Sequence, residues 1–206
     1  MEIIDLGIRN FFETYQLQKF YLEKRRNNEI EDLLILVEHP PVITIGRNGK
    51  IENLLIGQEK LKELNIEFYQ IERGGDITIH NLGQLVGYLI FYLKNGFWNM
   101  KSFINKVEDL IIQVLKSFNI KGEKKEKFIG VFVEDRKICS IGMAINKNIT
   151  FHGFALNVNN DLSYFQLINP CGIKDLKMTS IKEELKKDVS IEDVKKELIE
   201  VFKNGF

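Results

Sequence analysis

The segment Asn169-Pro170-Cys171-Gly172 places a thiol where it could act as a nucleophile. Proline fixes φ and glycine adopts φ values that other residues avoid, so the segment predicts a stiff, open bend around the cysteine. A thiolate presented on such a bend suits covalent catalysis. The alternative is an inert thiol, because a single cysteine is more often a small hydrophobic residue.

Lys137 is the residue whose charge could activate this thiol, although it lies far from Cys171 along the chain. A lysine that opens a strand, as Lys137 is predicted to do, is usually a solvent-facing charge. If the side chain instead turns inward beside the thiol, its ammonium group stabilises the thiolate. The sequence alone does not place these two residues side by side.

Glycine gathers at three points where strand-like patterns end. Because glycine lets the backbone come close to a ligand or turn with a positive φ, the three points could line one pocket. Three unrelated tight turns or bulges are the alternative, and for any single point they are the better interpretation. The segments are Arg73-Gly74-Gly75-Asp76, Ser140-Ile141-Gly142 and His152-Gly153-Phe154-Ala155.

The common motifs of nucleotide and metal chemistry are missing from the sequence. It has no G-x-x-x-x-G-K-[ST], G-x-G-x-x-G, C-x-x-C or H-E-x-x-H. His39, His80 and His152 stand singly on strand-like segments, where a hydrogen-bonded structural imidazole is commoner than a zinc ligand. The sequence therefore predicts neither a metal nor a cofactor.

Short strands and amphipathic helices must position these residues. The predicted helices begin at the Asn10 and Glu13 capping pattern and end near Asn28, cover 59–64, follow apolar spacing from Phe103 to Phe118, and begin again at Ser190 with Asp193. The predicted strands are 32–38, 42–46, 66–71, 76–80, 85–93, 128–133, 137–145 and 150–158, and the last three form an antiparallel meander. The charged stretches 121–127 and 182–188 are predicted to be solvated surface. The mixed order of elements favours one α+β domain over residues 1–206.

Composition narrows the class of protein. The chain has 206 residues with 29 Lys+Arg and 29 Asp+Glu, so no net charge attracts nucleic acid or an anionic membrane. No apolar stretch approaches the ~20 residues of a membrane-spanning helix. Two cysteines are too few for a disulfide scaffold, and the first residues lack a secretory signal. We therefore expect a cytoplasmic protein.

Several separated strings together resemble one family. They are Glu38-His39-Pro40-Pro41, Gly46-Arg47, Arg73 to His80, Gly83 to Tyr88, Lys137-Ile138, Ser140 to Gly142, Phe151 to Val158, Asp161-Leu162, Phe165 and Ile168 to Ile173. In order and spacing this set resembles the lipoyl(octanoyl) transferase family, which is related in fold to lipoate and biotin protein ligases. The likeness spans nearly the whole chain, and the combination is far more specific than any one string.

The resemblance implies a fold, a reaction and partners. It implies an α+β ligase-like fold with a mixed, mostly antiparallel sheet flanked by helices. It also implies transfer of an octanoyl group from acyl carrier protein to a lysine of lipoyl domains, those of 2-oxoacid dehydrogenase complexes and the glycine cleavage H protein, through a thioester on Cys171 with Lys137 as its partner. By the same likeness the acyl site is lined by Arg73, Gly74, Gly75, Asp76, Ile77, Thr78, Ile79, His80, Ser140, Ile141, Gly142, Gly153, Phe154 and Ala155.

The chain departs from the family pattern beside this predicted pocket. Asn81-Leu82 stands where the family usually has Gly-Pro, and Leu89 replaces a usual proline. These changes remove rigid turns and bear on the fit of the acyl chain. Cys139 stands where the family usually has a small residue, and two positions after Lys137 on a strand it should share that face, which makes it a rival thiol.

Two other functions stay open on the sequence. An ATP-dependent lipoate or biotin ligase on the related fold would form an adenylate and no covalent enzyme intermediate, and it would have no use for a positioned thiol. A catalytically silent module that binds the acyl carrier protein or the lipoyl domain would bind tightly without turnover.

Overall fold

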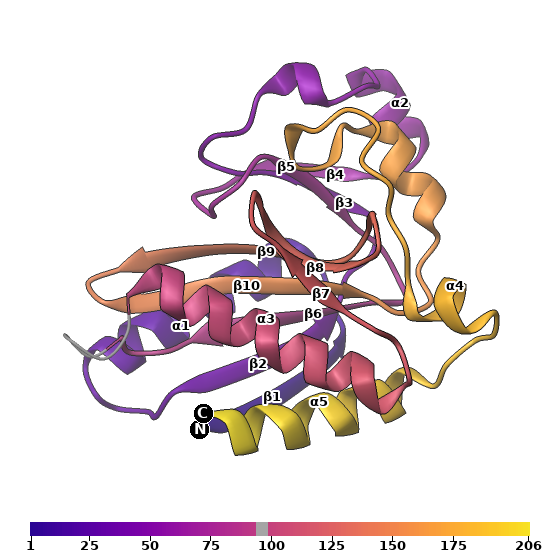
Figure 1. The fold of residues 1–206 in the computed structure, drawn as a ribbon. Helices are drawn as coiled ribbons and strands as arrows, with labels where there is room; N and C mark the ends of the chain where they lie inside the picture. The colour runs from indigo at the N-terminus through magenta and orange to yellow at the C-terminus, as the bar shows by residue number, and fades with distance from the viewer. Residues whose placement is uncertain (94–98) are drawn as a thin grey trace.

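The computed structural model describes residues 1–93 and 99–206, in which helices surround two sheets (Figure 1). The helices are α1 Phe11–Arg26, α2 Gln58–Glu63, α3 Met100–Ser117, α4 Ile181–Leu185 and α5 Ile191–Gly205, with short 3-10 turns η1 Ile51–Asn53, η2 Leu162–Leu167 and η3 Pro170–Gly172. The strands are β1 Glu2–Ile8, β2 Leu33–Glu38, β3 Val42–Ile45, β4 Glu67–Gln70, β5 Ile77–His80, β6 Gln84–Ile90, β7 Glu123–Lys125, β8 Phe128–Val133, β9 Arg136–Asn146 and β10 Ile149–Asn157. The predicted α+β class is confirmed.

The larger sheet has the strand order β1-β2-β6-β10-β9-β8-β7 among the described residues. Only the β1–β2 pair is parallel there, and the other neighbours are antiparallel. Its strand β2 is apolar on both faces because helices cover both. Leu34 and Leu36 pack with α3 and α5, while Ile35 and Val37 pack on the opposite face with Leu22 of α1. Figure 1 shows α3 and α5 along one side of this sheet.

The smaller sheet has the order β4-β3-β5 and lies above the larger one in Figure 1. Strand β3 pairs parallel with β4 and antiparallel with β5. Its core joins Ile43 and Ile79 to Leu61 of α2 and Phe165 of η2. The sequence patterns do not reveal that the strands divide into two sheets, because tertiary contacts choose the pairing partners.

Most predicted elements are confirmed, including the β8–β9–β10 meander and the cap of α1 by the Asn10 side chain. Strand β1 was not expected, and it is held by parallel pairing with β2. Stretch 121–127 is exposed or half-buried, as expected for solvated surface, and part of it forms the edge strand β7, whose charged residues suit an exposed edge. Within the described residues, no helix combines the length and apolar character needed to cross a membrane.

Candidate active site

Cys171 lies on the short turn η3 in a backbone conformation that is unusual for a residue with a side chain. Its φ is +58° and its ψ is 17°, in the left-handed region. Hydrogen bonds hold this turn, from Gly172 N to Asn169 O at 2.9 Å and from Ile173 N to Pro170 O at 3.1 Å. The thiol is free and half-buried. Left-handed residues other than glycine are often found at functional sites, where the surrounding structure holds the strain.

Lys137 meets this thiol although the two residues are distant in sequence. Its Nζ lies 3.3 Å from Cys171 Sγ, and the lysine is only 3% exposed. Its backbone is tied to the segment after η3, because Lys137 N donates to Lys177 O at 2.8 Å and Thr179 N donates to Lys137 O at 2.9 Å. The structure therefore brings a buried amine against a half-buried sulfur, in the geometry of a thiolate–ammonium pair.

Gly130 on β8 leaves space for the side chain of Lys137, because it has no side chain of its own. It has a φ of +122°, and a Cβ there would lie 2.6 Å from Lys137 Cε and 2.4 Å from Cys139 O. Gly130 N donates to Glu108 Oε1 at 2.8 Å. Among the described residues Glu108 is the one buried carboxylate, and burial raises its pKa, while the Gly130 N–H and the charges of Lys124 and Lys137 oppose that rise. Sequence reasoning missed Glu108, which reads there only as part of a helix.

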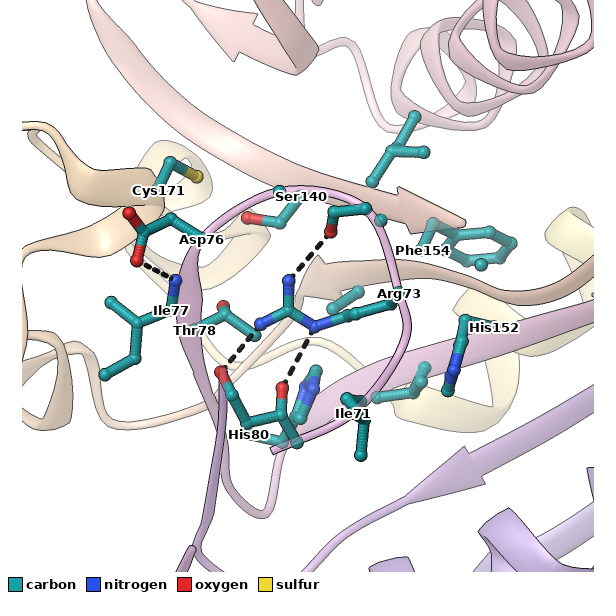
Figure 2. Close-up of a pocket in the computed structure, with 18 of the residues that line it drawn as sticks. Ile71, Arg73, Asp76, Ile77, Thr78, His80, Ser140, His152, Phe154 and Cys171 are labelled. Carbon is teal, nitrogen blue, oxygen red and sulfur yellow. Dashed lines mark hydrogen bonds between the residues drawn. The ribbon is translucent and has the colours of Figure 1, made fainter. Parts of the chain in front are cut away.

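Arg73 brings a second cation to the site. Its guanidinium donates to Thr44 Oγ1 at 3.1 Å, to Thr44 O at 2.7 Å and to Gly74 O at 2.9 Å (Figure 2). Burial lowers the pKa of Arg73 to about 10, and Cys171, Asp76 and Tyr88 counteract part of that effect. The guanidinium therefore keeps its charge at neutral pH beside the thiol.

A pocket runs between the loop before β5 and the strands β9 and β10. Its empty volume is about 520 Å³, which includes the open solvent at its mouth. In Figure 2, Cys171 and Asp76 lie at one end, and Phe154 and His152 lie at the other. The lining residues are Phe11, Thr44, Ile71, Arg73, Gly74, Gly75, Asp76, Ile77, Thr78, His80, Val86, Tyr88, Ser140, Ile141, Gly142, His152, Gly153, Phe154, Ala155 and Cys171.

The pocket brings together thirteen of the fourteen residues predicted to line an acyl site; Ile79 is the exception. The side chains of Ile79 and Ile77 both belong to the core of the smaller sheet, on the face of β5 opposite to Thr78 and His80, and of these two only Ile77, beside the Asp76 loop, also borders the pocket. Phe11, Ile71 and Val86 also line the pocket, and no motif in the sequence marked them. Their apolar pattern is that of ordinary core residues.

The three histidines, single in the sequence, lie close together in the fold, since the His39 ring lies 6.0 Å from that of His80 and 5.9 Å from that of Tyr88, which lies 6.4 Å from that of His152. His39 Nδ1 donates to Arg9 O at 2.7 Å and its Nε2 accepts from the Tyr88 hydroxyl at 2.8 Å, while His80 Nδ1 donates to Gln84 Oε1 at 2.6 Å. His152 Nε2 is buried with no partner in the described part of the chain.

These imidazoles are neutral at physiological pH. Burial is the main cause, and it lowers the pKa of His39 to about 4 and the pKa values of His80 and His152 to about 3. The described residues contain no group of three or more histidine, cysteine or acidic side chains arranged to hold a metal ion. His80 and His152 thus line the pocket as neutral polar groups, while His39 is not a lining residue and bonds to Tyr88.

Cys139 is placed very differently from Cys171. It is fully buried in the core beneath α3 and does not line the pocket. A β-bulge at Ile138 interrupts the alternation between Lys137 and Cys139, since Val131 pairs with Cys139 and Phe132 pairs with Lys137. The expectation that both side chains present one common face is therefore corrected. Burial raises the pKa of the Cys139 thiol more than the nearby charge of Lys137 lowers it.

The arrangement suits one kind of chemistry. A thiol paired with an ammonium group lies at the mouth of a pocket whose walls are mostly apolar or neutral, so a chain-like apolar group could bind in the pocket with its carbonyl carbon near the sulfur. Together with the two-sheet α+β fold, these features define a protein of the acyl-group-transferring class.

Comparisons with known proteins agree with that class. The sequence model of the lipoyl protein ligase A/B catalytic domain matches residues 10–203. An octanoyltransferase from Dictyoglomus turgidum is 48% identical over 186 residues, covering 90% of this chain and 78% of the relative. An octanoyltransferase from a Thermoanaerobacter species is 43% identical over 206 residues, covering 100% of this chain and 90% of the relative. The chain belongs to the lipoyl protein ligase A/B catalytic domain family, and it is an acyltransferase.

Solved structures share the fold at low sequence identity. A lipoate-protein ligase A bound with ATP superposes with a TM-score of 0.78 at 15% identity, covering 99% of this chain and 84% of the other. A bipartite lipoate protein ligase from Thermoplasma acidophilum, described with its E2 lipoyl domain, gives 0.76 at 16% identity, covering 99% and 82%. Biotin protein ligase from Aquifex aeolicus gives 0.55 at 16% identity, covering 100% and 68%. The predicted ligase-like fold is confirmed.

Proposed function

We propose that this enzyme transfers an octanoyl group from acyl carrier protein to a lysine of lipoyl domains through a thioester on Cys171. The observation that carries the proposal is the 3.3 Å contact between Lys137 Nζ and Cys171 Sγ at the mouth of the pocket. The names of the curated relatives support octanoyl as the acyl group. We further propose that the enzyme works in the cytoplasm, where its free thiols stay reduced.

In the first step, the Cys171 thiolate attacks the carbonyl carbon of the octanoyl thioester. A bond forms between Cys171 Sγ and that carbon, and the bond from the carbon to the donor sulfur breaks. The leaving thiolate takes a proton from the Lys137 ammonium, which lies beside the reacting sulfur. Because one thioester replaces another, this step needs little thermodynamic drive.

In the second step, the lysine amine of the lipoyl domain attacks the acyl group on Cys171. An ordinary lysine is neutral in only about one molecule in 2,500 at pH 7, so the attack needs a base. The acceptor ammonium first releases one proton to solvent. As the neutral amine attacks, Lys137, neutral after the first step, takes the second proton from the nitrogen, the amide bond forms, the carbon–sulfur bond breaks, and the Cys171 thiolate leaves paired with the ammonium once more. Conversion of a thioester to an amide drives the reaction forward.

The pocket supplies a dry place for the acyl chain. Phe11, Ile71, Val86 and Phe154 contribute apolar walls. Burial of each methylene stabilises the complex by about 0.8 kcal/mol, so binding favours chains long enough to fill the space. The Asn81-Leu82 and Leu89 departures lie outside the lining residues. We therefore propose that the acyl fit is set by the residues that line the pocket.

Intact-mass spectrometry after mixing with octanoyl carrier protein tests the proposal. We expect one octanoyl adduct, mapped to Cys171, absent in Cys171→Ala, present in Cys139→Ala, and removed by lipoyl domain. An adduct on Cys139 would contradict the assignment of the nucleophile. Octanoylation of the lipoyl domain that requires free octanoate and ATP, with no adduct on the enzyme, would identify a ligase instead. Tight binding without turnover would identify a silent module.

A further inference from the structure

The Asp76 carboxylate joins segments of the chain that meet beneath the thiol. Its Oδ1 accepts from Ile77 N at 2.7 Å and from Lys50 N at 3.3 Å. Its Oδ2 accepts from Asn53 Nδ2 at 2.8 Å. Three donors from β5, η1 and the residue before η1 therefore converge on one carboxylate. An apolar acyl chain would gain nothing from contact with this charged and fully engaged group.

Asn53 connects that carboxylate to the turn that carries Cys171. Asn169 N donates to Asn53 O at 2.8 Å, and Asn169 Nδ2 donates to Asn53 Oδ1 at 3.4 Å. On the other side of the thiol, Gly172 packs directly on the carboxylate, since a Cβ at this position would lie 2.6 Å from Asp76 Oδ2. The residues on both sides of the Pro170-Cys171 pair are thus fixed, directly or through Asn53, by Asp76.

We propose that Asp76 is a positioning residue that holds Cys171 in its left-handed conformation through Asn53 and Gly172, and that it does not bind the acyl group. This inference rests on the proposed function, in which Cys171 carries the acyl group. It changes the role of a residue that the sequence resemblance assigns to the acyl site.

We call the contacts of Asp76 with Asn53 and Gly172, together with the bonds from Asn169 to Asn53, the clamp. The clamp matters because the two reactive groups are held by separate parts of the chain. The backbone of Lys137 is fixed by its hydrogen bonds to residues 177 and 179, and its side chain packs closely against Gly130. The turn that carries Cys171 is fixed by the bonds from Asn169 to Asn53 and by the contact of Gly172 with Asp76. The Nζ to Sγ distance therefore depends on both supports, and a displacement of about 1 Å can slow a reaction about 100-fold.

The test compares a broken clamp with a reversed one. Asp76→Asn places two amide donors against each other at the Asn53 contact. The double variant Asp76→Asn with Asn53→Asp restores the pair with donor and acceptor exchanged, and every other bond of the clamp is kept. The matched control is Asp175→Asn, which removes the same charge close to the Cys171 turn in sequence, in the segment after η3, at an exposed residue with no polar partner among the described residues.

The readouts are the rate constant and the KM of Cys171 acylation by octanoyl carrier protein. For Asp76→Asn we expect an acylation rate constant about 100-fold lower at an unchanged KM, with most of the rate recovered in the double variant and none lost in the control. A raised KM at an unchanged rate constant would make Asp76 an acyl-binding residue and overturn the proposal. A double variant as slow as the single one, or a single variant as fast as the native enzyme, would overturn it too.

Two further measurements keep the result interpretable. Circular dichroism and thermal melting establish whether Asp76→Asn folds; if it does not, Asn53→Ala and the double variant carry the same comparison of rate constant with KM. The native enzyme is acylated in the same experiment. If native Cys171 never acquires the octanoyl group, the proposed function fails, whereas acylation of the native enzyme with no effect of the clamp variants refutes only the role of Asp76.

Discussion

Cys139 and Cys171 lie on two sides of Lys137 in opposite surroundings. Cys171 is half-buried on a left-handed turn, with its sulfur 3.3 Å from the ammonium group. Cys139 is fully buried in the core beneath α3, where burial dominates and raises the pKa of its thiol. The same side chain near the same lysine is thus presented for reaction on one side and sealed into packing on the other. The comparison teaches that a nearby cation does not by itself activate a thiol, because burial raises the pKa of Cys139 more than the charge of Lys137 lowers it.

Replacing each cysteine by alanine gives the largest expected contrast. Cys171→Ala should lower octanoyl transfer by at least about 10⁴-fold, because loss of a nucleophile removes the covalent route. Cys139→Ala should keep the transfer rate and lower the free energy of unfolding by about 1 kcal/mol, since it only opens a small space in the core. Steady-state assays and urea melts measure the two effects. Equal activity losses in both variants would erase the contrast.

Lys137→Ala tests whether the ammonium group serves the exposed thiol. We expect acylation of Cys171 to slow by about 10²- to 10⁴-fold with the fold retained, as is usual when an acid–base group is removed. Lys187→Met, at an exposed lysine without an ion pair among the described residues, is the control and should leave the rate unchanged. The rate constants are measured by quenching the acylation reaction at successive times and determining the acylated fraction by intact-mass spectrometry. Native-like acylation of the Lys137 variant would remove the lysine from the mechanism.

The three buried, neutral histidines predict that the free energy of unfolding depends on pH. The folded pKa values of about 4 for His39 and about 3 for His80 and His152 lie below the ordinary value of 6.5. The unfolded chain therefore binds more protons between these limits, so stability is complete above pH 6.5 and is lost as the pH falls toward 3. Each histidine should cost about 1–2 kcal/mol between pH 7 and pH 5.

Urea melts at pH 7 and pH 5 check this dependence. His152→Asn replaces a titrating residue with one that tolerates the positive φ of 57° at this position, so its loss of stability between the two pH values should be smaller than that of the native enzyme. An identical loss in both proteins would show that His152 is not kept neutral by the fold.

Glu108 supports the strand that separates the two thiols, because it accepts from the N–H of Gly130, a residue that lies close to both Lys137 and the backbone of Cys139. Glu108→Leu leaves the buried Gly130 N–H without an acceptor and should lower the free energy of unfolding by about 1–3 kcal/mol. Glu108→Gln keeps an acceptor oxygen and should lower it much less. Denaturant melts of the two variants decide, and equal losses would mean that the charge, and not the acceptor, is what the fold needs.

Much of the fold follows from local patterns, but the pairing of the strands does not. The apolar spacing of α3 and the cap of α1 each predict their element from adjacent residues. Strand β1 was missed because it depends on parallel pairing with β2 across the intervening helix. The smaller sheet was not separated from the larger one for the same reason.

The candidate site shows the same distinction between features that local sequence encodes and contacts that join distant segments. The bend around Cys171 and the glycine-rich loop at Arg73 are marked by residue types that the backbone requires, so the sequence identifies them. The meeting of Lys137 with the thiol, the support from Glu108 and the Asp76 clamp join segments that are distant along the chain. No spacing within the sequence encodes such contacts. The face of Cys139 was wrongly assigned because a bulge is invisible to a simple alternation of strand residues.

The most direct test of the central claim is whether an acyl group on Cys171 moves to the acceptor fast enough. The octanoylated enzyme is isolated, mixed with lipoyl domain in a quenched-flow instrument, and both proteins are followed by intact mass. The account predicts that octanoyl disappears from Cys171 and appears on the domain lysine with one rate constant, no smaller than the steady-state turnover number. Octanoylated domain that accumulates during turnover, while the adduct on Cys171 persists unchanged, would contradict it.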